Sequence, residues 1–321
     1  MKSVPGIKSL ATAFRRRPTR GPRVLSAAAF LTGLLAVSAV AAKAQTPAAG
    51  EDPLKASSSR AAQEEALQSL PSEKLDAEAR AKVDAVLSNV SLFRRLPVRV
   101  IQCDPDFYLL LVQHPDIVVN IWRLLGVTRM SVEQTGSTTF RVADGTGTVG
   151  TLEYLYQSPD TQVVYADGTY EGPLFGKTIH CKTLAILKSG YVLEADGRYY
   201  ITTRLDAFMN VQNLGAEILA KTFQPLVCRA ADINFTQTAG FVGSLSHTAE
   251  LNPRGIQRLS GRLVKVPADV RQQFAETADR IAKRAAALPE RTVQRPPLPY
   301  RKSDLPAPSE PRLAERPTTS E

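Results

Sequence analysis

Six short segments with the composition of β-strands follow one another between residues 127 and 208. Threonine, valine, tyrosine and isoleucine are common in them, and turn residues such as glycine, proline and aspartate separate them. The predicted strands cover residues 128–134, 138–143, 148–157, 162–170, 177–188 and 198–208. The connections are too short for the crossover helix that joins parallel strands, so the sequence predicts antiparallel neighbours in one sheet.

Helical patterns precede the predicted sheet. A strand over 98–102 is followed by Asp-Pro-Asp at 104–106 and His-Pro-Asp at 114–116, each of which opens an apolar segment. Proline suits the first position of a helix and aspartate suits its positive end. We therefore expect two short helices, over 107–112 and 117–126.

A long helix is predicted after Phe208, because apolar residues recur at helical spacing as far as Leu245. Pro225 should kink this helix or split it in two. A further amphipathic helix is expected after Pro267.

This order of a strand, two short helices, six antiparallel strands and a long helix resembles the START-like, or helix-grip, superfamily over about residues 96–251. The resemblance implies an α+β fold in which a curved antiparallel sheet of about six to seven strands wraps around a long C-terminal helix. It also implies a cavity between sheet and helix, often for lipids, sterols or polycyclic aromatics. Pro225 and the helical segment after residue 251 depart from this pattern, and these additions could fill the groove or serve a partner.

The first 44 residues predict a signal peptide. Residues 1–23 are basic without any acidic residue, and an apolar run of 19 residues follows over 24–42. Ala42 and Ala44 form a small-x-small site with cleavage after Ala44. The apolar run is close to the roughly 20 residues that span a bilayer, so an uncleaved helix anchored in the inner membrane is the alternative. Both interpretations place the rest of the chain outside the cytoplasm, in the periplasm or secreted.

The charge of the chain changes when the leader is removed. The full sequence has 40 Lys and Arg residues against 31 Asp and Glu residues, a net charge of +9. Eight of the basic residues and none of the acidic ones lie in residues 1–44, which leaves 32 against 31. Binding through phosphates requires a basic footprint, so we expect the exported chain not to bind nucleic acid.

Composition divides the rest of the chain into predicted helical and disordered segments. Residues 45–71 predict a disordered spacer, residues 72–95 contain an N-terminal helix, and residues 252–288 form a C-terminal helical extension. Residues 289–321 contain eight prolines and predict a disordered Pro-rich tail, which could contact a membrane or an envelope protein.

Three cysteines leave the redox state open. Cys103, Cys181 and Cys228 allow one disulfide in any of three pairings, or they are small buried apolar residues. Their spacing does not match a metal site, and the sequence predicts no cofactor and no metal.

Aromatic residues in or near the strands are the candidates for lining a cavity. Leu152, Tyr154 and Tyr156 alternate with other residues and should therefore face the same side of a strand. His180 is the one histidine placed where a cavity is expected. The predicted ligand-binding residues are Tyr154, Tyr156, Tyr165, Phe175, His180, Tyr199 and Phe223.

No catalytic motif is recognisable, because the three histidines are far apart and no Gly-x-Ser-x-Gly or His-Glu-x-x-His occurs. The sequence favours a non-catalytic protein that binds an apolar small molecule or lipid. Two alternatives stay open. One is a structural or envelope-interaction protein with a filled groove, acting through its C-terminal helix and tail. The other is an enzyme of the cyclase or aromatase kind, which would use His180 or a pocket carboxylate.

Overall fold

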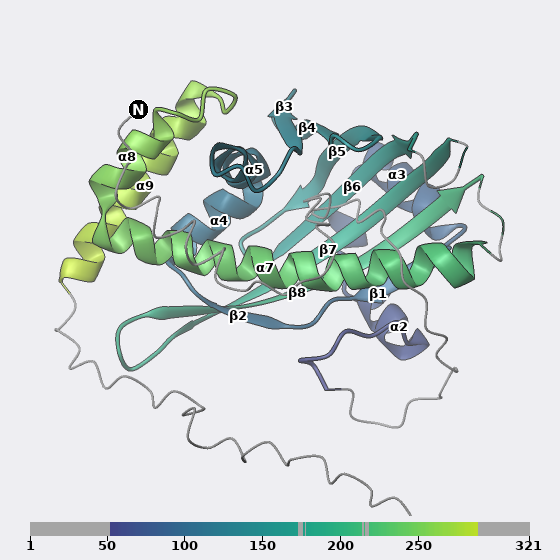
Figure 1. Cartoon of the computed structure of the whole chain (residues 1–321). Coiled ribbons are helices and arrows are strands. Elements are labelled where there is room, and N and C mark those ends of the chain that lie inside the picture. The colour runs from purple at the N-terminus through teal and green to yellow at the C-terminus, as the bar shows by residue number, and fades with distance from the viewer. Residues whose placement is uncertain (1–51, 173–175, 177, 214, 216–217, 288–321) are drawn as a thin grey trace, which may run out of the picture. The chain divides into compact units, whose positions relative to one another are not determined.

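The structure is a computed structural model that describes residues 52–172, 176, 178–213, 215 and 218–287 (Figure 1). The chain forms two compact units, Met1–Ala287 and Leu288–Glu321, and the second lies outside the described residues. The predicted signal peptide and the predicted Pro-rich tail lie outside them as well. Within the described ranges, no helix is both long enough and apolar enough to cross a membrane.

The described part of the chain has an α+β fold with one open antiparallel sheet of eight strands, which confirms the predicted α+β class and the antiparallel sheet. The order across the sheet is β1-β8-β7-β6-β5-β4-β3, and β2 also pairs with β8. The strands are β1 (Leu92–Arg95), β2 (Arg99–Gln102), β3 (Ser131–Gln134), β4 (Thr139–Ala143), β5 (Thr148–Gln157), β6 (Thr161–Tyr170), β7 (Ile179–Leu193) and β8 (Tyr199–Gln212).

Strands β1 and β2 together form one edge of the sheet. Leu92 pairs with Met209 near the end of β8, whereas Arg99 pairs with Thr203 further back along the same strand. Between the two strands, the N–H of Leu96 donates to the carbonyl of Leu205 at 2.8 Å. Pro97 follows, and its lack of an N–H suits an edge position. Hydrogen bonding along β8 is therefore continued from β1 to β2, although the two strands are separate segments of the sequence.

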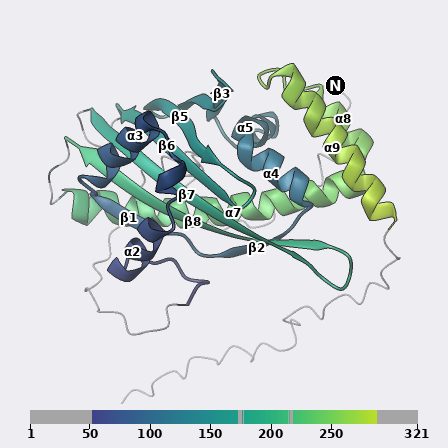
Figure 2. The ribbon, with the colours of Figure 1, turned by 180° about the vertical axis from the view of Figure 1, so that it is seen from behind.

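Helices cover both faces of the sheet (Figures 1 and 2). The described helices are α2 (Arg60–Gln68), α3 (Ala77–Leu87), α4 (Pro105–Gln113), α5 (Pro115–Leu124), α7 (Gln224–Leu251), α8 (Pro253–Ser260) and α9 (Ala268–Ala286), with a 3-10 turn, η1 (Ser72–Lys74), and a π-helical turn, η2 (Leu219–Phe223). Helices α4, α5 and α7 lie on one face, which we call the inner face, and α2 and α3 lie on the outer face, seen nearer the viewer in Figure 2. The core is accordingly split between the two faces.

The C-terminal helices pack onto the inner-face layer. Helix α9 contacts α4 and α7, and the ring of Phe274 stacks on that of Phe107 with centroids 5.5 Å apart. At the other end of α9, Arg284 bridges Asp104 and Asp106 at 2.6 and 3.0 Å. Asp104 also caps α4 by accepting from two backbone N–H groups. The predicted C-terminal extension is therefore attached to the sheet domain.

An ion-pair network fixes α2 to the outer face. Asp206 of β8 is fully buried and accepts two hydrogen bonds from Arg95 of β1, at 2.7 and 3.1 Å. Arg95 also donates to the Glu65 carboxylate and to the Ala62 carbonyl of α2. Removal of either charge from such a buried pair would leave the other uncompensated.

One segment predicted to be disordered contains a helix. Residues 45–71 were predicted to be a spacer, yet Arg60–Gln68 forms α2, capped by Ser59 and burying Ala62 and Ala66. Alanines supply the contact there, so the segment carries few of the large apolar residues that indicate a core. Helix α8 lies in the predicted C-terminal helical extension, ahead of the helix expected after Pro267; Asn252 caps it and Pro253 occupies its first turn.

Several predicted boundaries also differ. Strand β7 continues through Gly190, which pairs with Thr202, so the predicted end of this strand at residue 188 is wrong. Pro225 lies just after the π-helical turn η2, and α7, which contains it, runs for 28 residues. The sheet has one strand more than the upper prediction because residues 92–95 form β1.

Candidate functional site

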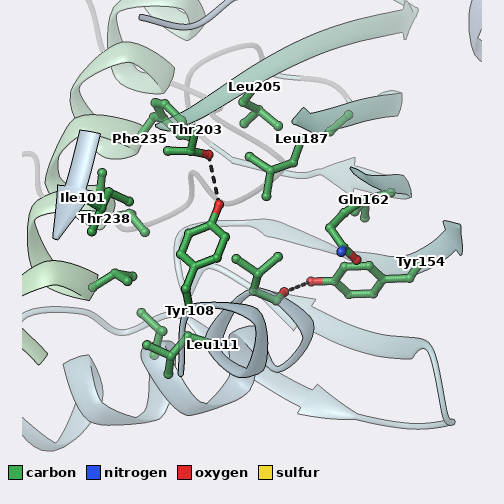
Figure 3. A pocket seen from close by; sticks show the side chains of 16 residues that line it. Ile101, Tyr108, Leu111, Tyr154, Gln162, Leu187, Thr203, Leu205, Phe235 and Thr238 are labelled. Carbon is green, nitrogen blue, oxygen red and sulfur yellow. Dashed lines mark hydrogen bonds between the residues drawn. The ribbon is translucent and has the colours of Figure 1, made fainter. Parts of the chain in front are cut away.

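The candidate site is a pocket between the inner face of the sheet and helices α4, α5 and α7, with a volume of about 80 Å³ (Figure 3). None of the residues lining it carries a charge. They are Ile101, Tyr108, Leu111, Val112, Val118, Tyr154, Gln162, Val164, Ala185, Leu187, Thr203, Leu205, Phe235, Thr238, Ala239 and Val242.

Strand pairing selects the sheet residues that line the pocket. Val164 of β6 pairs with Ala185 of β7, and Gln162 pairs with Leu187, which in turn pairs with Leu205 of β8. Directly paired residues point to the same face, and residues two apart along a strand do so as well. The pocket floor is therefore a set of alternate positions on neighbouring strands.

Tyr108 connects α4 to β8 across the pocket. Its hydroxyl donates to Thr203 Oγ1 at 3.1 Å and lies 2.8 Å from Ser189 Oγ. Figure 3 shows its ring extending toward Thr203. Burial raises the pKa of Tyr108, so this hydroxyl stays neutral.

The hydroxyl of Tyr154 connects β5 to α4 at the wall of the pocket. It donates to the carbonyl of Val112 at the end of α4. Burial raises the pKa of Tyr154, and the nearby carboxylate of Asp116 raises it further. This side chain therefore offers the pocket mainly its ring.

Gln162 offers the pocket a free hydrogen-bond acceptor. Its side-chain Nε2 donates to the Ser158 carbonyl, but its Oε1 is buried and accepts no hydrogen bond from any described residue. Only 2% of Gln162 is exposed. A buried acceptor without a partner costs about 1–3 kcal/mol, and a ligand with an O–H or N–H group could recover that cost.

The pocket opens between β7, β8 and the middle of α7. Leu187, Leu205 and Phe235 line it and are half-buried, whereas Val164, Ala185 and Ile101 are buried. The buried residues therefore line the deepest part of the pocket, and the half-buried apolar side chains border its mouth.

Asp116 is a second buried polar group near this region. It lies in the first turn of α5, is fully buried, and neither carboxylate oxygen has a hydrogen-bond partner among the described residues. Burial raises the pKa of Asp116 to about 6. Asp116 does not line the pocket, but its charge raises the pKa of Tyr154, which does.

The structure brings one predicted site residue, Tyr154, into the pocket. Tyr156 and Tyr165 belong to the outer-face core beneath α2 and α3. Phe223 is buried in a separate inner-face cluster with Cys181 and Cys228. The others are His180 and Tyr199, which are exposed on β7 and β8, and Phe175, which lies outside the described residues.

A β-bulge separates Tyr154 from Tyr156. Tyr154 pairs with Val164, but Tyr156 pairs with Val163, so the register shifts between them. Val163 and Val164 face opposite sides of the sheet, and the two tyrosines do so too. Strict alternation had predicted one shared face, and that prediction is wrong.

Sequence patterns gave little sign of the pocket's polar residues. Tyr108 lies within an apolar helix, and Gln162 and Thr203 each stand beside other polar residues, Thr161 in one case and Thr202 and Arg204 in the other. The alternation of Gln162 with Val164, and of Thr203 with Leu205, does indicate a shared face. It does not tell which face is covered by helix α7.

The cysteines are three buried free thiols. Burial raises the pKa of Cys103 and of Cys181 to about 12, so neither is a reactive thiolate near neutral pH. Among the described residues, no three His, Cys, Asp or Glu side chains are grouped closely enough to hold a metal ion.

Comparison with known proteins found no family model that matches the chain and no curated protein similar to it in sequence.

Proposed function

We propose that this chain is an exported, non-catalytic protein that binds a small apolar molecule, or one end of a lipid, with a hydrogen-bond donor on the buried part. The observation that carries the proposal is the unpartnered Oε1 of Gln162 in a pocket without charged residues. Ligand pockets are typically apolar with a few polar groups that fix orientation, and Gln162 is such a group.

The size of the pocket limits the buried part of the ligand. A volume of about 80 Å³ is smaller than the roughly 150 Å³ cavity known to hold benzene. A compact ring or a short chain end that carries a hydroxyl group is therefore the preferred occupant, with some widening of the pocket. A bulkier ligand would extend through the mouth past Phe235.

The arrangement of elements supports a helix-grip architecture, which forms part of the proposal. The edge strands β1 and β2 pair with the last strand, β8, and the sheet then runs back in sequence order to β3. Helix α7 follows β8 and contacts β2 and α4. In this architecture the sheet curves around α7, and the pocket is the space left between them.

Export is proposed from the basic and apolar leader over residues 1–44. Outside the cytoplasm, a pocket for an apolar molecule would serve transport or capture of a compound that is poorly soluble in water. No reaction is required for that role.

The test is native mass spectrometry of the protein purified from a host that exports it, followed by organic extraction. We expect a bound apolar compound with a hydroxyl or N–H group. The Ala239→Leu variant, which fills the pocket, should lack it. An unliganded mass for the original protein, with no uptake of phenol or a fatty alcohol offered in excess, would contradict the proposal.

The small pocket volume favours one second candidate, a structural or envelope-interaction protein whose groove is filled. Helix α9 packs against α4 and α7, and its Phe274 stacks on Phe107, so the C-terminal extension already buries much of the inner-face layer. This candidate predicts that the protein stays unliganded and that removal of residues 288–321 abolishes association with the envelope.

A further inference from the structure

Positive charge is concentrated in the segment 251–267, which contains α8 and the turn before α9. The segment has four basic residues and no acidic one. The chain from residue 45 onward is nearly neutral, with 32 basic residues against 31 acidic ones. The four basic residues are Arg254, Arg258, Arg262 and Lys265.

Three of these basic residues have no acidic partner in the described part of the chain. Arg254, Arg258 and Arg262 are exposed and form no ion pair with any described residue. Lys265 differs because it pairs with Glu133. Two acidic residues flank the segment in sequence: Glu250, which pairs with Arg198, and Asp269, which is exposed at the start of α9.

Two apolar side chains extend into solvent at the ends of the same segment. Val264 is 79% exposed and Leu251 is 73% exposed, the highest values for large apolar residues in the described part of the chain. Between them, Ile256 and Leu259 are buried against the rest of the domain. The segment therefore has a buried side that anchors it and an exposed side that combines arginines with protruding apolar groups.

We propose that this α8 surface (Leu251, Arg254, Arg258, Arg262 and Val264) docks onto a membrane that contains anionic phospholipid. The arginines pair with lipid phosphates, and the two apolar side chains enter the interface. Basic residues combined with protruding apolar ones are the composition of interfacial membrane contacts. An acidic protein would satisfy the arginines but would give no reason for two apolar groups at the ends of the surface.

The test is co-sedimentation of residues 45–321, which retain every described residue, with lipid vesicles. Vesicles of phosphatidylcholine are compared with vesicles containing one quarter phosphatidylglycerol. We expect binding only to the anionic vesicles, with weakening as salt is raised. Replacing all three arginines with glutamine should reduce the affinity about 100-fold, from roughly fivefold for each arginine.

A control variant removes the same charge elsewhere: Lys55, Arg60 and Arg80 are exposed and lie in or near α2 and α3. Their replacement with glutamine should leave vesicle binding unchanged. Val264→Asp should weaken binding even at low salt, and circular dichroism should show all variants folded. Equal binding to both kinds of vesicle, or an equal loss in the control variant, would overturn the proposal.

Binding to soluble polyglutamate as tight as to vesicles, and insensitive to Val264→Asp, would indicate an acidic protein partner. That result would also overturn the proposal of membrane docking.

Discussion

The hydroxyl of Tyr108 donates a hydrogen bond to Thr203 Oγ1 at 3.1 Å and so joins α4 to β8 across the pocket. Tyr154 makes a comparable connection to the carbonyl of Val112. Both hydroxyls are occupied by the protein itself, whereas the Oε1 of Gln162 is buried and has no partner among the described residues. Substitution of Gln162 therefore tests whether the pocket recognises a hydrogen-bond donor on the ligand.

Gln162→Leu should shift the preference of the pocket between phenol and toluene, which have similar shapes but differ in a hydroxyl group. We expect the ratio of phenol affinity to toluene affinity to fall by about tenfold, because phenol loses its acceptor. NMR titration of both ligands measures this ratio. Thr238→Val, another polar-to-apolar change in the pocket lining, is the control. An equal shift in the control would show that Gln162 is not the acceptor.

Ala239→Leu should stabilise the unliganded protein, because the added carbons enter the pocket. We expect the free energy of unfolding to rise by about 0.5–2 kcal/mol, measured by urea denaturation. Ala249→Leu makes the same change on the same helix at a fully buried residue that does not line the pocket. Overpacking there should destabilise the protein by about 1–3 kcal/mol. Equal destabilisation by both substitutions would mean that the pocket is not available space.

Asp116 should make the protein less stable as the pH rises from about 4 to about 6. Its pKa is raised from 3.8 to about 6 in the folded state, so over this range the folded state holds more protons than the unfolded state. Asp116→Asn should remove this dependence and add about 2–3 kcal/mol to the free energy of unfolding at pH 7. At pH 3.5 the two proteins should be nearly equal. Denaturation measured at several pH values checks both expectations.

Asp144 should change stability with pH in the opposite direction to Asp116. Burial tends to raise the pKa of Asp144, but hydrogen bonds from Thr146 and Thr148 lower it overall. Its contribution to stability is therefore present at neutral pH and is lost in acid. Asp144→Asn should destabilise the protein at pH 7 and have less effect as the pH falls below the ordinary range of an aspartate. Identical pH profiles for the Asp116 and Asp144 variants would refute both assignments.

Asp206→Ala should strongly destabilise the outer face. It leaves the charge of Arg95, which is only 12% exposed in its side chain, without its buried partner. We expect a loss of about 3–5 kcal/mol in the free energy of unfolding. Glu64→Ala removes an exposed partner of Arg60 on the same helix, α2, and should change stability by less than about 0.5 kcal/mol. A loss below 1 kcal/mol for Asp206→Ala would mean that the pair does not hold α2.

The central strands could be predicted from sequence because clear turn residues separate them. Strand β5 was predicted at its observed bounds, and β4 and β6 within one residue. Strand β7 was cut short because Gly190 looked like a turn residue, although neighbouring strands hold it in the sheet. Helix α8 lies within the predicted helical extension over 252–288, and its start at Asn252 and Pro253 repeats the capped proline start that predicted α4 and α5.

The pocket depends on relationships between elements that local patterns do not record. The bulge in β5 decides that Tyr154 faces α7 and Tyr156 faces α3, and it arises from strand pairing. Gln162 lines the pocket because β6 presents its even-numbered residues to the helices on the inner face. Aromatic content was a poor guide for the same reason, since aromatic residues are abundant on both faces of the sheet.

The pairing of β1 and β2 with β8 also affects when the protein can fold. Ser91 and Val211 exchange hydrogen bonds although they are 120 positions apart in sequence. Contacts between such distant residues form slowly, because a long loop must close first. This edge of the sheet cannot form until all of the described strands have been synthesised, because β8 is the last of them. For a chain that is exported as proposed, slow closure would prolong the unfolded state in which a polypeptide can be threaded through a membrane.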